Sequence, residues 1–328
     1  MTGSAYALVP RLAPAALALA LAAGCAAPAN RAPSAPFPAG GWPAEQIDPG
    51  LQAALDTLTA GFDGVLGAYV RHLPSGRTAS VRADDTFPTA SLVKVPILIG
   101  VFQAVEAGDL AFDQRLTFRD SLRYIEDEGE LFAQLRDSAT VVLHSAVEQM
   151  LSASDNTASL WLQALVTGAA VNDWLAAEGF EHTRVNSRTP GREADRERYG
   201  WGQTSPREIA ELVRRIVEGE AVSPPADHEM HRLLTRTHYD DEAVAQLPPS
   251  VQVASKQGAV SRSRSEVAYV HAPSGPYLLA VVTREQGDAS WDPDNEGWEA
   301  IRAVSRLAWA AFEGEAWRAP AGAERFRL

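Results

Sequence analysis

A serine and a lysine three residues apart could together form an activated nucleophile. Ser91 and Lys94 lie in the segment Ser91-Leu92-Val93-Lys94, where an apolar helical pattern begins. On a helix, this spacing places the hydroxyl and the amine on one face, one turn apart. The amine can accept the serine proton, and the helix N-terminus favours negative charge developing beside the hydroxyl. Taken alone, the pair also fits a helix-capping serine with a surface lysine.

Two later triplets favour the catalytic interpretation. Ser154-Asp155-Asn156 stands at the start of a predicted helix, and Lys256-Gln257-Gly258 ends a predicted strand. In this order and on these elements, the chain resembles the class A β-lactamases and their relatives among the penicillin-binding serine hydrolases. The resemblance covers about residues 50 to 313 and includes a hairpin before the serine, a helical insert and a closing helix.

The resemblance implies a role for each residue of an acylating site. Ser91 would attack a lactam or acyl carbonyl, and Lys94 would be the base. Ser154 would relay a proton to the departing nitrogen. Asn156 would hydrogen-bond both the substrate amide and Lys94.

The strand that carries the third triplet would bind substrate. Lys256 would supply positive potential, and the N–H group of Ala259 would complete an oxyanion hole with that of the nucleophile. Gln257, followed by Gly258, stands where the family usually has a small hydroxyl residue that contacts the substrate carboxylate. The bulkier amide leaves substrate preference open.

An arginine after this strand would bind the substrate carboxylate, because its guanidinium offers a two-pronged donor. Arg264 is our candidate and Arg262 the alternative; surface solvation remains the competing interpretation for both.

The loop that should carry a deacylating glutamate departs from the family pattern. Thr189 falls at the position of that glutamate, and a threonine has no carboxylate to activate water. Glu193 is the candidate replacement, and Glu197 lies nearby in the same charged run. As members of that run, both also fit a solvated surface role.

The elements that must position these residues follow from periodicity and turn signals. Strands are predicted over 65–70, 78–82, 251–256, 266–271 and 277–284, and helices over 91–108, 205–219 and 298–312. Residues 110–181 show helical periods and no strand signal, and 186–203 form a long loop, ordered or disordered. We therefore predict an α/β (α+β) fold: an antiparallel sheet flanked by helices, with an inserted all-helical subdomain. The sheet part spans about 48–108 and 204–314, and the helical part about 109–203.

The first residues are predicted to be an export signal. Residues 1–24 contain Arg11 and then a short apolar run, and Leu21-Ala22-Ala23-Gly24-Cys25 resembles a lipobox. We expect Cys25 to carry a lipid anchor and residues 25–47, rich in Pro and Ala, to be an extended tether before a catalytic domain over 48–328. The chain is then exported to the periplasm or cell envelope. A plain secretory signal with an incidental cysteine is the alternative.

Charge and composition exclude other classes. The formal net charge of −13 offers no sequence-independent hold on nucleic acid. His228, His231 and His238 could hold zinc, but their spacing differs from that of His-Glu-x-x-His metalloproteases and no cysteine joins them, so we predict no metal and no cofactor. We expect a monomer that contacts the membrane only through its anchor.

Taken together, the sequence predicts a serine hydrolase that forms an acyl-enzyme on Ser91 and hydrolyses β-lactams. The first alternative is a DD-peptidase-like hydrolase or transferase acting on peptidoglycan peptides. The second is a penicillin-binding lipoprotein that does not turn over because the usual glutamate is missing.

Overall fold

A computed structural model describes residues 41–124 and 130–322 of the chain. The predicted signal, Cys25 and most of the predicted tether lie outside the described residues. The end of that tether differs from the prediction, because Gln46 and Ile47 pair with Arg77 and Thr78 and so belong to the folded domain.

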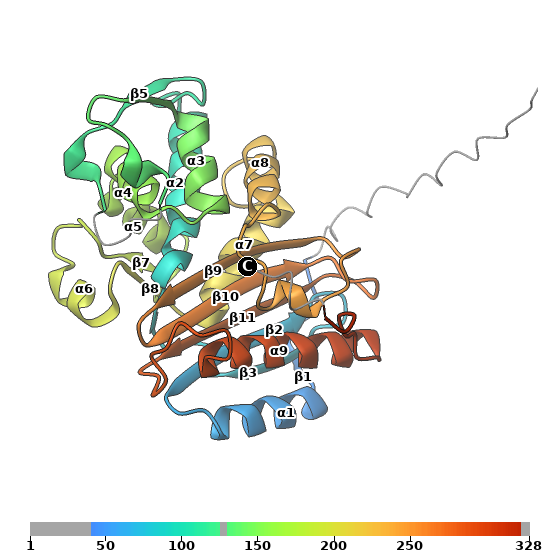
Figure 1. The fold of residues 1–328 in the computed structure, drawn as a ribbon. Coiled ribbons are helices and arrows are strands. Elements are labelled where there is room, and N and C mark those ends of the chain that lie inside the picture. Colours follow the sequence, from blue (N-terminus) through green and yellow to red (C-terminus); the bar gives the residue numbers. More distant parts are fainter. Residues whose placement is uncertain (1–40, 125–129, 323–328) are drawn as a thin grey trace, which may run out of the picture. The chain divides into compact units, whose positions relative to one another are not determined.

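The described residues are built on a six-stranded sheet (Figure 1). Every strand pair is antiparallel except the short first pair, which is parallel. This confirms the predicted sheet, with that one parallel pair as a difference. The strand order is β1 (Gln46–Ile47), β3 (Arg77–Val81), β2 (Val65–His72), β11 (Tyr277–Arg284), β10 (Ser263–Val270) and β9 (Val253–Val260).

Alternating side chains of the sheet enter two separate cores. On the central strand β11, Leu278, Ala280 and Val282 pack into one core, whereas Leu279 and Val281 pack into the other. Successive side chains along a strand point to opposite faces of the sheet. A strand whose residues are all apolar is therefore expected to be covered on both faces. Both faces of the sheet are therefore covered.

Helices cover the two faces. On one lie α1 (Pro49–Ala60) and α9 (Glu296–Glu313), side by side, and on the other lies α7 (Pro206–Glu218) (Figure 1). Ser205 caps α7 by accepting from the Glu208 N–H at 3.3 Å. The remaining helices are α2 (Lys94–Glu106), α3 (Leu143–Ser152), α4 (Asn156–Val166), α5 (Gly168–Ala177), α6 (Glu193–Tyr199) and α8 (Pro224–Leu234).

Short elements complete the described part of the chain. Four 3-10 turns and two small sheets connect the helices. The turns are η1 (Ala90–Val93), η2 (Asp120–Leu122), η3 (Phe132–Gln134) and η4 (Val244–Gln246), and the strands are β4 (Phe87–Pro88), β8 (Gly202–Thr204) and β7 (Arg184–Val185) in one sheet and β5 (Arg115–Thr117) and β6 (Thr140–Val142) in the other.

The helical part, predicted over 109–203, departs from the prediction in two small sheets: β5 pairs with β6, and β8 pairs with β7 and β4. Residues 110–181 contain the antiparallel pair β5 and β6, although no strand was expected there. Each strand has only three residues, too few for alternation to register as a pattern. The predicted long loop is ordered around α6 and β8.

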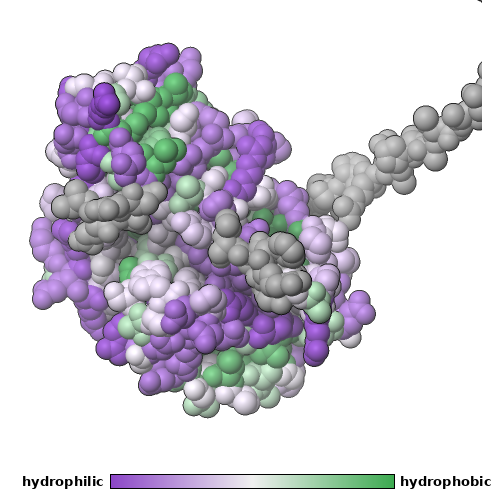
Figure 2. All heavy atoms as spheres, in the orientation of Figure 1, coloured by the Kyte–Doolittle hydropathy of each residue, from purple (hydrophilic) through white to green (hydrophobic). Residues whose placement is uncertain are grey.

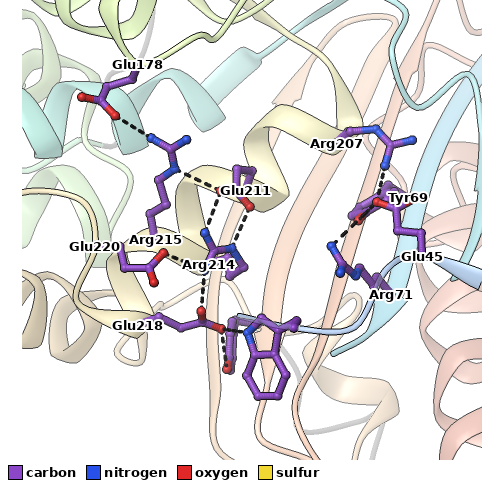
Figure 3. A network of polar contacts seen from close by, with 12 residues as sticks. Glu45, Tyr69, Arg71, Glu178, Arg207, Glu211, Arg214, Arg215, Glu218 and Glu220 are labelled. Atoms are coloured by element: carbon purple, nitrogen blue, oxygen red, sulfur yellow. Dashed lines mark hydrogen bonds and ion pairs between the residues drawn. The ribbon is translucent and has the colours of Figure 1, made fainter. Parts of the chain in front are cut away.

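A network of charged side chains ties α7 to its neighbours (Figure 3). Arg214 pairs with Glu211 at 2.7 Å and with Glu218, and Arg215 reaches Glu178 beyond the end of α5 at 2.8 Å. The Arg214 pairs lie within α7, and the pair of Arg215 with Glu178 joins α7 to the end of α5 in the helical part.

Most of the surface seen in Figure 2 is formed by hydrophilic residues, with apolar side chains gathered in separate patches. Within the described ranges, no helix has both the length and the apolar character needed to cross a membrane.

Candidate active site

Ser91 and Lys94 meet at the junction of η1 and α2. The Lys94 Nζ donates to Ser91 Oγ at 2.9 Å. The first nine residues of α2, Lys94 to Phe102, are all buried, so Lys94 at the first turn carries its amine into the interior, where it is completely shielded from solvent. A buried ammonium or amine requires hydrogen-bond partners, and the surrounding turns provide them.

The turn between α3 and α4 supplies those partners. Lys94 Nζ also lies within hydrogen-bond distance of Ser154 Oγ at 3.0 Å, of the Ser154 carbonyl and of Asn156 Oδ1 at 2.8 Å. Ser154 adopts a left-handed backbone conformation with φ of 56°, which is uncommon for a residue other than glycine. In this conformation, both oxygens of Ser154 contact the lysine.

Strand β9 places a second lysine, Lys256, beside the Ser154 hydroxyl. Lys256 Nζ lies 3.0 Å from Ser154 Oγ and donates to the Gln257 carbonyl at 2.7 Å. It is fully buried, and burial, followed by the neighbouring Lys94, holds its pKa well below the ordinary value. The Ser154 hydroxyl thus lies between two amines and can pass a proton between them or to a third group.

The backbone of β9 approaches the nucleophile directly. A Cβ placed on Gly258 would lie only 2.8 Å from the Ser91 backbone nitrogen and 2.9 Å from the Thr89 carbonyl. Ser265 Oγ reinforces the contact, donating to the carbonyls of Gly258 at 3.1 Å and Thr89 at 3.3 Å. Because β9 is the last strand of its sheet, its outer edge faces this turn and not another strand.

Residues from all three motifs line one cleft of about 1360 Å³. Ser91, Ser154 and Asn156 form one wall, and Gln257 with Gly258 and Ala259 forms the other. The cleft therefore brings together the three sequence motifs, with the triplet of β9 lying within the strand and not at its end.

The two candidate arginines lie elsewhere. Arg264 is fully buried, its guanidinium carbon 4.4 Å from the ring centroid of Trp291 and 4.9 Å from that of Trp298. Its nitrogens donate to backbone carbonyls, among them that of Ser263 at 3.0 Å. The exposed Arg262 binds the Gln286 carbonyl at 2.6 Å. Neither guanidinium is among the groups that line the cleft.

The candidate deacylating residues are likewise outside the cleft. Glu193 and Glu197 are exposed on α6, where Glu193 Oε1 accepts from the Gly191 N–H at 3.1 Å. Thr189 is buried and donates to the Ser187 carbonyl of its own loop at 2.9 Å. The structure thus brings neither glutamate to Ser91.

Four charged residues at or beside the cleft escaped the sequence analysis. Glu130 lines it and binds the first turn of α4. Glu242 and Arg302 also line it and pair at 2.7 Å, and burial raises the pKa of Glu242 to about 7. Glu266, opposite Gln257 on β10, is fully buried, and burial raises its pKa to about 8. None belongs to a recognisable motif, so no sequence signal marks them.

The histidines form a stacked pair and not a cluster of three. The rings of His231 and His271 lie 5.3 Å apart, and burial lowers the pKa of His231 to about 4. Among the residues that the structure describes, no group of three or more His, Cys, Asp or Glu side chains is placed to hold a metal ion.

The pair formed by the cleft-lining Ser91 and the buried Lys94 in this fold defines a serine hydrolase, and comparisons with known proteins agree. Residues 50–312 match the model of the β-lactamase enzyme family. The chain is 29% identical over 242 residues to a β-lactamase of Streptomyces albus G, covering 69% of this chain and 75% of that protein. The chain therefore belongs to the β-lactamase enzyme family.

Solved structures give the same result. The structure of PBP-A is similar with a TM-score of 0.74 and 29% identity, over 84% of this chain and 100% of that one. A mutant of PBP-A, 29% identical with a TM-score of 0.74 over 83% of this chain and 100% of that one, was solved as an acyl-enzyme complex with penicillin G. A β-lactamase from Sphaerobacter thermophilus has a TM-score of 0.71 and 27% identity, over 82% of this chain and 98% of that one. The predicted family, fold and enzyme class are confirmed.

Proposed function

We propose that this enzyme hydrolyses β-lactams through an acyl-enzyme on Ser91. The observation that carries the proposal is the chain of hydrogen bonds that joins Ser91 Oγ to Lys94 Nζ at 2.9 Å and Lys94 Nζ to Ser154 Oγ at 3.0 Å. It provides a nucleophile and a proton relay in the cleft and a buried proton acceptor in contact with both.

Acylation follows from this arrangement. In its neutral form, the Lys94 amine accepts the Ser91 proton as Oγ attacks the lactam carbonyl. The C–N bond of the lactam then breaks, and Ser154 Oγ delivers a proton to the departing nitrogen, replaced by one from Lys94 or Lys256. The product is an ester on Ser91.

The gap between η1 and β9 supports an oxyanion hole. The close approach of Gly258 to the Ser91 backbone nitrogen brings the strand edge within reach of a carbonyl oxygen bound at Ser91. The N–H groups of Ser91 and Ala259 are the donors in our proposal. Such donors act where negative charge develops in the transition state.

The positions of the candidate deacylating residues favour a second candidate function. Glu193, Glu197 and Thr189 do not line the cleft, so none is placed to activate water at the ester. This favours a long-lived acyl-enzyme, as in a penicillin-binding protein. A DD-peptidase-like hydrolase or transferase acting on peptidoglycan peptides would use the same acylating groups and is the other alternative. The acyl-enzyme complex of the PBP-A mutant with penicillin G is consistent with acylation of such a fold.

Export and lipid anchoring form a separate part of the proposal. Their support is the apolar run before Cys25 and the lipobox-like residues around it. A Cys25→Ser variant should partition into the soluble fraction of cells that express the full chain. Firm membrane retention of that variant would contradict the anchor.

Turnover distinguishes the candidate functions. The soluble domain is mixed with excess benzylpenicillin, and the mass of the intact protein and the loss of substrate are followed in parallel. An adduct that forms and clears as substrate disappears supports the β-lactamase; a persistent adduct supports the penicillin-binding alternative. Release of D-alanine from a D-Ala-D-Ala peptide supports the peptidase, and no reaction in any assay contradicts all three.

A further inference from the structure

Glu130 binds the helix that carries part of the active site. Its Oε1 accepts from the Asn156 N–H at 2.7 Å, and its Oε2 accepts from the Thr157 N–H at 3.0 Å. These are the first two residues of α4, whose amides have no partner within the helix. A carboxylate at a helix N-terminus also interacts favourably with the helix dipole.

The next residues of the same segment form a second attachment to this turn. The Phe132 N–H donates to Asp155 Oδ2 at 2.9 Å, while Asp155 Oδ1 accepts from the Ala158 N–H at 2.7 Å. Glu130 and Asp155 together therefore satisfy the amides of Asn156, Thr157 and Ala158. Residues 130–132 and the Ser154–Asn156 turn are held to each other from both sides.

The turn needs such support because of its backbone. Ser154 has a positive φ of 56°, a conformation that persists only where the surroundings enforce it. The same turn must direct Ser154 Oγ and Asn156 Oδ1 toward Lys94, at 3.0 and 2.8 Å. A displacement of the start of α4 would lengthen both hydrogen bonds.

Glu130 lies in the cleft itself, beside the groups that it orders. It is partly buried and lines the cleft with Ser91, Ser154 and Asn156. We propose that Glu130 is a positioning residue for acylation, holding the Ser154–Asn156 turn against Lys94 through the amides of α4. The proposal depends on the proposed function only in requiring that Ser91 can be acylated.

The charge on Glu130 gives this role a pH dependence. Burial raises the pKa of Glu130 above the ordinary value, and Asp155 raises it further, whereas the two amides and Lys94 act in the opposite direction. Protonation removes the negative charge from the helix N-terminus and weakens acceptance from the amides. Acylation should therefore fall on the acid side, at a pH above the ordinary range of a glutamate.

The test compares Glu130→Gln with a matched buried carboxylate. Asp227 accepts from the amides of Ala221 at 2.8 Å and Val222 at 3.0 Å, burial raises its pKa, and it lies outside the cleft. The second-order rate of acylation by a fluorescent penicillin is measured from pH 4 to 8, together with Tm. We expect Glu130→Gln to lower the rate by about 10- to 100-fold and to change the position of the acid limb. Asp227→Asn should lower Tm and keep both the rate and the limb.

The outcomes separate the two proposals. If the wild-type protein is not acylated, the proposed function fails. If it is acylated and Glu130→Gln keeps both the rate and the acid limb, the positioning role is refuted. Should Glu130→Gln not fold, Glu130→Asp serves instead: it retains the charge with a shorter reach, so a slower rate with the acid limb preserved is expected, and an unchanged rate refutes the role.

Discussion

We expect the Gly258→Ala substitution to slow acylation of Ser91, because it forces strand β9 away from the turn that carries the nucleophile. The added methyl group would lie 2.8 Å from the Ser91 backbone nitrogen and 2.9 Å from the Thr89 carbonyl, both main-chain atoms that cannot rotate away. Ordinary contact needs about 3.5 Å or more, so β9 and η1 must separate by roughly 0.6 to 1 Å. A misplacement of about 1 Å at reacting groups can cost on the order of 10²-fold in rate. We therefore expect acylation to slow by about 10²-fold.

The assay and its control follow from the same geometry. The acylation rate is measured by stopped flow with a fluorescent penicillin, and thermal unfolding is recorded for each variant. Gly61→Ala is the matched control, because a Cβ at Gly61 meets nothing closer than 3.8 Å and its φ of −91° suits any residue. We expect the control to match the wild type. An acylation rate of Gly258→Ala within about twofold of wild type would refute the oxyanion hole between η1 and β9.

Three further variants test other parts of the account. Glu193→Gln combined with Glu197→Gln should leave the rate of acyl-enzyme loss unchanged, because both side chains are exposed outside the cleft; intact-protein mass spectrometry measures it. Glu266→Gln should flatten the dependence of stability on pH: with a pKa raised from 4.5 to about 8, the folded state binds the proton more tightly, so wild-type stability falls as pH rises through that range. Arg264→Met should reduce the free energy of unfolding in urea by at least about 2 kcal/mol, since buried carbonyls lose their donor.

Each of these expectations has a contradicting result. Faster or slower loss of the adduct in the double glutamine variant would place one of those glutamates at the ester. Parallel stability curves for wild type and Glu266→Gln between pH 5 and 8 would mean that the carboxyl is not buried as described. Full stability of Arg264→Met would show that the stack between Trp291 and Trp298 does not support the fold.

The catalytic motifs were predictable because their geometry is local or their order is distinctive. Ser91 and Lys94 are joined by one helical turn, and Ser205 with Pro206 and Glu208 marks the start of α7 by its capping chemistry. The hairpin of β2 and β3 follows from strand-forming residues on either side of a Pro-Ser-Gly turn.

The features that the sequence analysis did not predict depend on contacts between residues distant in sequence. Residues 261–265 read Ser-Arg-Ser-Arg-Ser, a polar run, yet Ser263 to Ser265 are buried because α9 and η1 cover the two faces of β10. Arg264 is accommodated there by Trp298, a residue 34 positions later. Glu130 reaches Asn156 across 26 residues, and no pattern in either segment signals that contact.

The central claim is that Ser91 is acylated with the help of Lys94. The most direct measurement is peptide mapping of the protein after brief exposure to benzylpenicillin, in wild type, Ser91→Ala and Lys94→Ala. We predict an adduct confined to the peptide that contains Ser91, absent in Ser91→Ala and formed about 10²- to 10⁴-fold more slowly in Lys94→Ala. An adduct that persists in Ser91→Ala, or forms at the wild-type rate without Lys94, would contradict the account.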